Sequence, residues 1–257
     1  MNVAHAATEG GISIHLSAPV LGHFFGIPVT STLIMVWTTM VLVVAFLLYM
    51  RPRLVLIPGK MQVAIEALLG GGFDYMAQAL ESRELARKFF PLIMSIFIFV
   101  LALNWIGLLP GVTAIGIYTE SHGVHSLVPF WYPANTDLNV TIAIALIAFF
   151  AIEIAGIAAL GLWKYGGKFI NFSSPLNFGI GIIELFSELA RLVSFSFRLF
   201  GNVFAGKTLL VIAMFFVPFI LPVPILAFEL FVGLIQAFIF AVLTLFFIKL
   251  AIAEPEH

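Results

Sequence analysis

Long apolar runs alternate with short polar segments along this chain of 257 residues. A helix that crosses the hydrocarbon core of a bilayer needs about 20 predominantly apolar residues. Runs of this kind cover five stretches: residues 32–50, 89–109, 139–162, 176–217 and 224–252. The pattern predicts five membrane-embedded helices in a single all-α polytopic membrane domain, residues 1–257.

The fourth run, residues 176–217, is too long for a simple crossing. A helix of this length extends about 60 Å at 1.5 Å per residue, roughly twice the hydrocarbon thickness. The helix must therefore break or lie steeply tilted, and no proline occurs within the run to break it.

Between the first two runs, residues 58–83 carry apolar side chains at roughly helical spacing among polar ones. The spacing predicts an amphipathic helix that lies on the cytoplasmic membrane surface. Three consecutive glycines, residues 70–72, predict an interruption of this helix.

The composition supports a membrane protein. Hydrophobic residues make up 62% of the chain and charged residues only 10%, with a mean hydropathy of +1.14, whereas soluble domains carry about 25% charged residues. The net charge of −1 and the lack of a basic run argue against nucleic acid as a partner. The absence of cysteine excludes disulfides and thiolate metal sites.

The basic residues predict the topology. Residues 1–31, 110–138 and 218–224 contain no Lys or Arg. Most of the Lys and Arg residues lie instead between the first and second runs and between the third and fourth runs: Arg51, Arg53, Lys60, Arg83, Arg87, Lys88, Lys164 and Lys168. With five crossings these connections all fall on one side, which the positive-inside rule makes cytoplasmic. The N-terminal segment 1–31 and the loop 110–138 are then outside, and the C-terminus is in the cytoplasm.

Arg198 lies in the middle of the fourth run. A guanidinium stays charged and is costly at bilayer depth, so it must face a polar surface. At 100° per residue, one stripe of roughly 120° holds most polar groups of this run: Glu184, Ser187, Glu188, Arg191, Ser194, Arg198 and Asn202. In one interpretation the charges pair locally, Glu184 or Glu188 with Arg191. Arg198 has no acidic residue three or four positions away, so its partner must lie on another helix or another protein.

The fifth run contains Glu229 and Gln236, seven residues apart and so on nearly the same face. A glutamine here is often only a hydrogen-bonding link between helices. An ionised Glu229 requires a cation or water, and Lys207 of the fourth run, on the face opposite Arg198, is the available cation. We expect a Glu229–Lys207 pair, or water between the two.

Other motifs are weaker. His122 and His125 have a spacing that could bind a metal, but an exposed pair of this kind is more often solvated. The chain has no phosphate-binding loop, no nucleophile elbow and no HExxH motif. We expect no metal site, no cofactor and no catalytic site of its own.

The string Arg-Leu-Phe-Gly-Asn at residues 198–202 closely resembles subunit a of the F-type ATP synthase, the membrane stator beside the rotating c-ring. Four further segments resemble the same family: IPGKMQVAIE at 57–66, NWIGLLPG at 104–111, TDLNVT at 136–141 and IQAFIFAVLT at 235–244.

The resemblance implies a fold and a function. The last two helices would form a long, strongly tilted hairpin against the c-ring. Arg198 would face the carboxylate of each passing c subunit and separate two offset half-channels, which couple an ion gradient to ATP synthesis. The ion would be the proton, with Na⁺ left open. The implied partners are the c-subunit ring, the b-subunit peripheral stalk, other ATP synthase subunits and the lipid of a bacterial plasma (inner) membrane.

Single positions carry over from the family. Asn202 and Gln236 match polar residues near the arginine, and Glu184 matches an acidic residue on the same helix. Glu229 and Lys207 match a coupled ionisable pair in the outer half-channel, commonly Glu with His. The lysine departs from that pattern, which leaves open whether it relays protons or tunes the channel. Three further residues are secondary candidates: Glu188, Arg191 and Ser194.

Two other functions were weighed. A secondary transporter could use Arg198 to bind an anionic substrate, but such folds usually show inverted repeats and interrupted helices, and the chain has no internal repeat. A purely structural membrane subunit would not need Arg198.

Overall fold

The computed structural model describes residues 18–121, 124–169, 174–218 and 220–253. Within these ranges, five helices are long and apolar enough to cross a membrane. They are α1 (Ser31–Met50), α3 (Arg83–Gly107), α4 (Leu138–Leu160), α6 (Pro175–Phe216) and α7 (Pro222–Ile252). The all-α polytopic fold is therefore confirmed.

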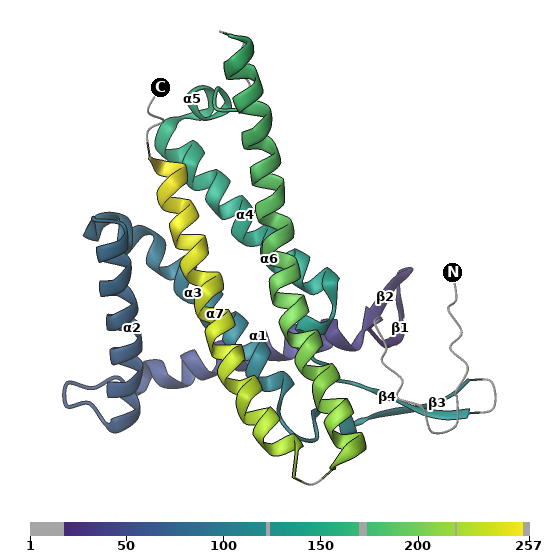
Figure 1. The fold of residues 1–257 in the computed structure, drawn as a ribbon. Helices are drawn as coiled ribbons and strands as arrows, with labels where there is room; N and C mark the ends of the chain where they lie inside the picture. Colours follow the sequence, from purple (N-terminus) through teal and green to yellow (C-terminus); the bar gives the residue numbers. More distant parts are fainter. Residues whose placement is uncertain (1–17, 122–123, 170–173, 219, 254–257) are drawn as a thin grey trace.

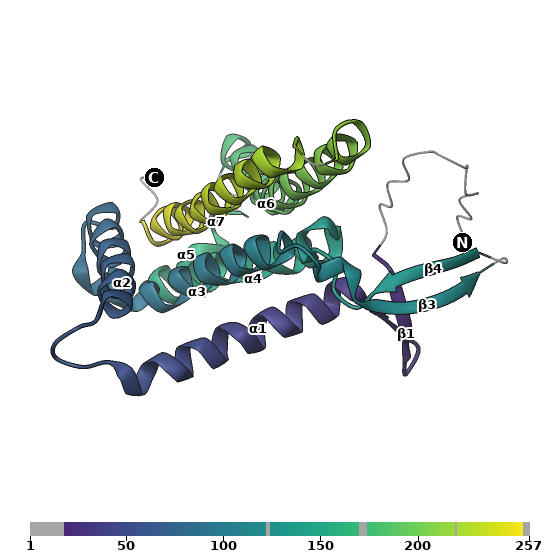
Figure 2. The ribbon, with the colours of Figure 1, turned by 90° about the horizontal axis from the view of Figure 1, so that it is seen from below.

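The long helices pack in layers. Figure 2 shows α6 and α7 side by side in one layer, α3 and α4 in the next, and α1 outside them. The core lies between the first two layers, where α7 contacts both α3 and α4. Fully buried Val100 of α3, Ile152 of α4 and Phe240 of α7 belong to it. Trp37 and Val41 on the outer face of α1 are each 60% exposed, as suits contact with lipid.

Helix α6 is unbroken over 42 residues, so of the two alternatives for the fourth run, the break is excluded. Ser174 caps its start by accepting a hydrogen bond from the backbone N–H of Leu176, and Pro175 occupies the first helical position, where its missing N–H costs nothing. A short turn then leads into α7, which runs back antiparallel to α6 (Figure 1).

Helix α2 (Lys60–Ala79) lies at the end of the bundle where α3 begins (Figure 1). It is continuous, so the interruption expected at residues 70–72 is wrong. A glycine inside a helix costs only about 1 kcal/mol relative to alanine, and packing can offset that. Gly72 lies where α2 packs against α3: a Cβ there would meet the sulfur of Met94 at 3.4 Å, an ordinary van der Waals contact.

Two β-hairpins were not predicted from the sequence. Strands β1 (Val20–Phe24) and β2 (Ile27–Thr30) pair antiparallel before α1, and β3 (Gly116–Ser121) pairs with β4 (Val124–Pro129) between α3 and α4. The hydroxyl of Ser31 donates to the carbonyl of Pro129 at 2.5 Å and joins the start of α1 to the second hairpin. Both hairpins lie at the end of the bundle opposite α2.

The remaining elements are short. Helix α5 (Leu162–Gly166) follows α4. Three 3₁₀ turns complete the described structure: η1 (Arg51–Arg53), η2 (Val112–Ala114) and η3 (Ala134–Thr136). Turn η3 contacts α1, α3, α4 and α6 and thereby fixes the connection that precedes α4.

Candidate functional site

Arg198 lies near the middle of α6 and has few partners. One guanidinium nitrogen, Nη2, donates to the hydroxyl of Ser194 at 3.3 Å, and the group lies 5.8 Å from the ring centroid of Phe195. The other terminal nitrogen, Nη1, is buried without a hydrogen-bond partner. No acidic side chain of the described residues forms an ion pair with it. A buried donor left unpaired is costly unless water or another molecule satisfies it.

On the C-terminal side of Arg198 lies a cavity of about 370 Å³ between α3, α6 and α7. A volume of this size holds several water molecules, each of which takes about 30 Å³ in the liquid. Its polar lining includes six of the side chains discussed below: Asn104, Asn135, Asn202, Lys207, Glu229 and Gln236.

Glu229 and Lys207 both line this cavity but do not meet. The carboxyl of Glu229 fills the space beside Gly206 of α6, and the residue is only 7% exposed. It has no hydrogen bond or ion pair to any residue that the structure describes. Lys207 instead donates to the hydroxyl of Tyr132, and its Nζ lies 3.5 Å from the centroid of that ring. The direct Glu229–Lys207 ion pair expected from the sequence is therefore not formed, because the tyrosine takes the ammonium group.

Four amide side chains make up two hydrogen-bonded pairs at the cavity wall. Asn202 donates to Gln236 at 2.6 Å and joins α6 to α7. Asn135 donates to Asn104 at 2.7 Å, and Asn104 donates to the carbonyl of Gly233 at 3.0 Å. The Nε2 of Gln236 and the Oδ1 of Asn135 are buried without partners. Unpaired polar atoms at a cavity wall are groups that bound water satisfies.

Asn104 and Asn135 were not among the predicted site residues. Asn104 was detectable, because an asparagine inside the apolar run 89–109 is itself an exception that calls for a partner. Asn135 and Tyr132 had no such signal. They lie in the connection between α3 and α4, and only the folded structure brings Asn135 to the cavity and Tyr132 to Lys207.

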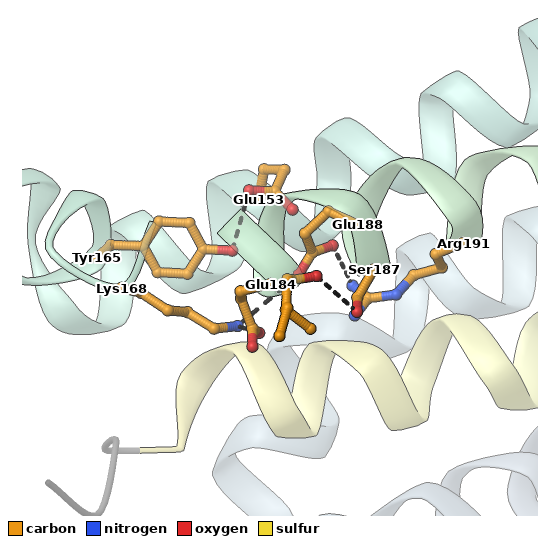
Figure 3. A network of polar contacts seen from close by, with 8 residues as sticks. Glu153, Tyr165, Lys168, Glu184, Ser187, Glu188 and Arg191 are labelled. Atoms are coloured by element: carbon orange, nitrogen blue, oxygen red, sulfur yellow. Dashed lines mark hydrogen bonds and ion pairs between the residues drawn. The ribbon is translucent and has the colours of Figure 1, made fainter. Parts of the chain in front are cut away.

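On the N-terminal side of Arg198, α6 carries a charged cluster (Figure 3). Arg191 pairs with Glu188 at 2.6 Å, which confirms local pairing for these two residues. Glu184 pairs instead with Lys168 at 2.5 Å, and the same lysine lies 3.7 Å from Glu188. Lys168, which was considered only for topology, thus joins the two acidic residues.

The cluster extends to a neighbouring helix. The hydroxyl of Tyr165 in α5 donates to the carboxylate of Glu153 in α4 at 2.9 Å (Figure 3). Burial and this carboxylate raise the pKa of Tyr165 above its ordinary value. The guanidinium of Arg191 lies 3.9 Å from the ring centroid of Phe247 in α7. Glu153 was missed, although an acidic residue in the apolar run 139–162 is a signal of the same kind as Asn104.

Along α6 there follow in turn a charged cluster, an arginine without an ion pair to any described residue, and a cavity of about 370 Å³ that Glu229 of α7 also lines. A search against family models matches residues 33–249 to the family described as ATP synthase A chain. The chain belongs to this family.

Curated relatives agree over most of the chain. ATP synthase subunit a of Moorella thermoacetica is 31% identical over 234 residues, which cover 91% of this chain and 96% of the relative. The subunit a of Mycobacterium ulcerans is 33% identical, with 89% of each chain covered. A subunit a from Propionigenium modestum, named as sodium ion specific, is 30% identical; the match covers 91% of this chain and 78% of the relative.

Family membership determines the general function. The chain is a multi-pass membrane subunit of the Fo sector, takes part in ion translocation for ATP synthesis and has other ATP synthase subunits as partners. Subunits of this family carry no catalytic site of their own. The family therefore favours ion translocation over the secondary transporter, which was the alternative function inferred from the sequence.

Proposed function

We propose that this chain provides two half-channels, offset along α6, through which protons reach and leave the carboxylates of a rotating c-ring. The arginine between them is the observation that carries the proposal. Arg198 has an unpaired buried Nη1, and polar regions lie on both sides of it along the helix.

The spacing along α6 separates the two regions. Arg191, in the charged cluster, precedes Arg198 by seven residues, and Lys207, at the cavity, follows it by nine. At 1.5 Å per residue these separations are about 10 Å and about 14 Å along the helix axis. An ion that enters one region must therefore pass the guanidinium to reach the other.

The cavity is the proposed outer half-channel, with Glu229 as its ion-exchanging group and Lys207, Asn202 and Gln236 in its wall. The cluster with Glu184 and Glu188 marks the start of the inner half-channel. Ser194 supports Arg198 through its hydrogen bond. The orientation follows from the basic residues, which put the α2 end in the cytoplasm and the hairpins outside.

The charge of Arg198 performs two tasks in this proposal. It favours the ionised form of a c-ring carboxylate, so a protonated site that passes it releases its proton. It also forms a fixed positive barrier against direct leakage, since a guanidinium cannot deprotonate. Each proton is driven by about 2.3 kcal/mol per 100 mV, and a leak would dissipate this drive.

The c-ring would dock on the face of α6 that carries Arg198, where exposed apolar side chains lie within about 60° of the arginine at 100° per residue: Ile180, Ile183 and Leu209. The b-subunit peripheral stalk is the second proposed partner. The inner membrane of a bacterium is the proposed location.

ATP synthesis in sealed vesicles tests the proposal. We expect Arg198→Gln to abolish proton-driven synthesis, and Arg198→Lys to lose most of it because an ammonium lacks the planar fork of the guanidinium. Arg87→Gln, which removes an exposed arginine of α3, is the matched control and should remain active. Coupled synthesis by the Arg198→Gln complex would overturn the proposal. Synthesis driven by a sodium gradient alone would replace the proton with Na⁺.

A further inference from the structure

An acidic and a basic side chain line one cavity without forming an ion pair. The carboxyl of Glu229 is buried beside Gly206, and Lys207 is the next residue along α6. They are the ionisable side chains among the described residues that line the cavity. Lysine has a flexible four-carbon stem and three donors, so reach alone does not keep it from the carboxylate. Some other group must hold the ammonium.

Tyr132 is that group. Its hydroxyl accepts a hydrogen bond from Lys207, and the ammonium lies 3.5 Å from its ring centroid. The face of an aromatic ring attracts a cation, so the tyrosine offers two favourable interactions at once. Together they compete with the attraction of Glu229.

The backbone around Tyr132 is anchored on both sides. The indole N–H of Trp131 donates to Thr38 of α1 at 3.0 Å. The carbonyl of Pro133 accepts from the hydroxyl of Thr136 at 2.6 Å. Asn135, two residues further on, is bonded to Asn104 of α3 at 2.7 Å. Tyr132 is therefore a fixed acceptor and does not follow the lysine.

We propose that Tyr132 is a positioning residue that holds Lys207 away from Glu229 and so leaves the Glu229 carboxyl free to exchange the translocated ion with water in the cavity. This inference rests on the proposed role of the cavity as an ion pathway. Without the tyrosine, Lys207 would bind Glu229 as an ion pair and remove the exchanging group from use.

A double-mutant cycle in the assembled ATP synthase tests the inference. We expect Tyr132→Leu, which removes both the hydroxyl and the ring, to lower proton-driven ATP synthesis in vesicles by about fivefold or more, within the range for contacting residues. Lys207→Gln in the Tyr132→Leu background should restore the rate to that of Lys207→Gln alone, because the competing charge is gone. Tyr118→Leu, at a tyrosine of β3 that is 78% exposed, is the matched control and should match wild type. Rates are divided by the amount of assembled complex.

Two results for Tyr132→Leu would overturn the inference. A Tyr132→Leu complex with the wild-type rate would overturn it. An equal loss with and without Lys207 would show that Tyr132 acts only through folding, and would also overturn it. A parallel Glu229→Gln variant distinguishes an error in the positioning role of Tyr132 from an error in the proposed ion pathway. If Glu229→Gln is inactive while Tyr132→Leu is harmless, only the positioning role falls; if Glu229→Gln is fully active, the outer pathway through Glu229 falls as well.

Discussion

Gly206→Ala is a small change with a specific consequence for the outer half-channel. A Cβ on residue 206 would fall in the volume that the Glu229 carboxyl occupies. Carbon atoms in contact lie about 3.5–4.0 Å apart, so the carboxyl would have to move by about 1 Å or more. The displaced group is the end of a flexible side chain, and it can turn away without moving the backbone.

The costs to stability and to activity differ. Alanine gains about 1 kcal/mol over glycine inside a helix, and a strained glutamate rotamer costs about 0.5–1.5 kcal/mol. The two contributions nearly cancel, so we expect normal amounts of assembled complex. Misplacement of a reacting group by about 1 Å can lower a rate by about 10²-fold. We therefore expect synthesis to fall by about 10- to 100-fold, toward the level of Glu229→Gln.

The assay is proton-driven ATP synthesis in vesicles, normalised to assembled complex. Gly179→Ala is the matched control, because this glycine lies on the same helix and a Cβ there meets no atom within 4 Å. In the Gly206→Ala background, Glu229→Asp shortens the acid by one methylene and should recover part of the activity. Equal rates for Gly206→Ala and Gly179→Ala would refute the role of the Glu229 carboxyl at this position.

Two further expectations concern stability. Asn104→Ala leaves the amide of Asn135 and the carbonyl of Gly233 without the Asn104 side chain. At about 1–3 kcal/mol for each of the two groups, we expect a loss of about 2–6 kcal/mol, visible as a lower melting temperature of the complex. Tyr165→Phe removes the bond to Glu153 and should cost about 1.5–3 kcal/mol at pH 7. Because the pKa of Tyr165 is raised above 10.0, this stabilisation is complete below pH 10 and is lost above it. The difference in melting temperature between Tyr165→Phe and wild type should therefore be constant to about pH 9 and become smaller above pH 10. A difference that stays constant at all pH values would contradict a stabilising hydrogen bond from Tyr165 to Glu153.

The apolar pattern predicted the long helices because an apolar run of about 20 residues or more can satisfy its backbone hydrogen bonds in lipid by forming a helix. The same pattern failed where packing decided the outcome. Residues 70–72 stay helical because α2 packs along α3, and this packing offsets the low helix propensity of glycine. The hairpin before α1 and the hairpin after α3 are made of short strands, and alternation over a few residues is a weak signal.

In the candidate site, too, some features were predictable from the sequence and others were not. Arg198, Glu229 and Lys207 were detectable from the sequence because ionisable residues are rare at bilayer depth. Their partners were not detectable. The lysine was expected to pair with Glu229 or share a water with it, yet its ammonium binds Tyr132, 75 residues earlier in the chain. A contact at that sequence separation depends on the folded positions of η3 and α6, which a single sequence does not encode in any local pattern.

The central claim is that Arg198 is the barrier between two half-channels, and passive proton flux tests it most directly. The measurement uses sealed vesicles that contain the complex with Arg198→Ala under an imposed proton gradient. One sample without ADP follows the passive decay of the gradient, and a parallel sample with ADP and phosphate follows ATP synthesis. The account predicts that ATP synthesis is lost while the gradient decays faster than in wild-type vesicles, because the fixed positive charge no longer separates the cavity from the charged cluster. Vesicles that hold the gradient as well as wild type and still synthesise ATP would contradict it.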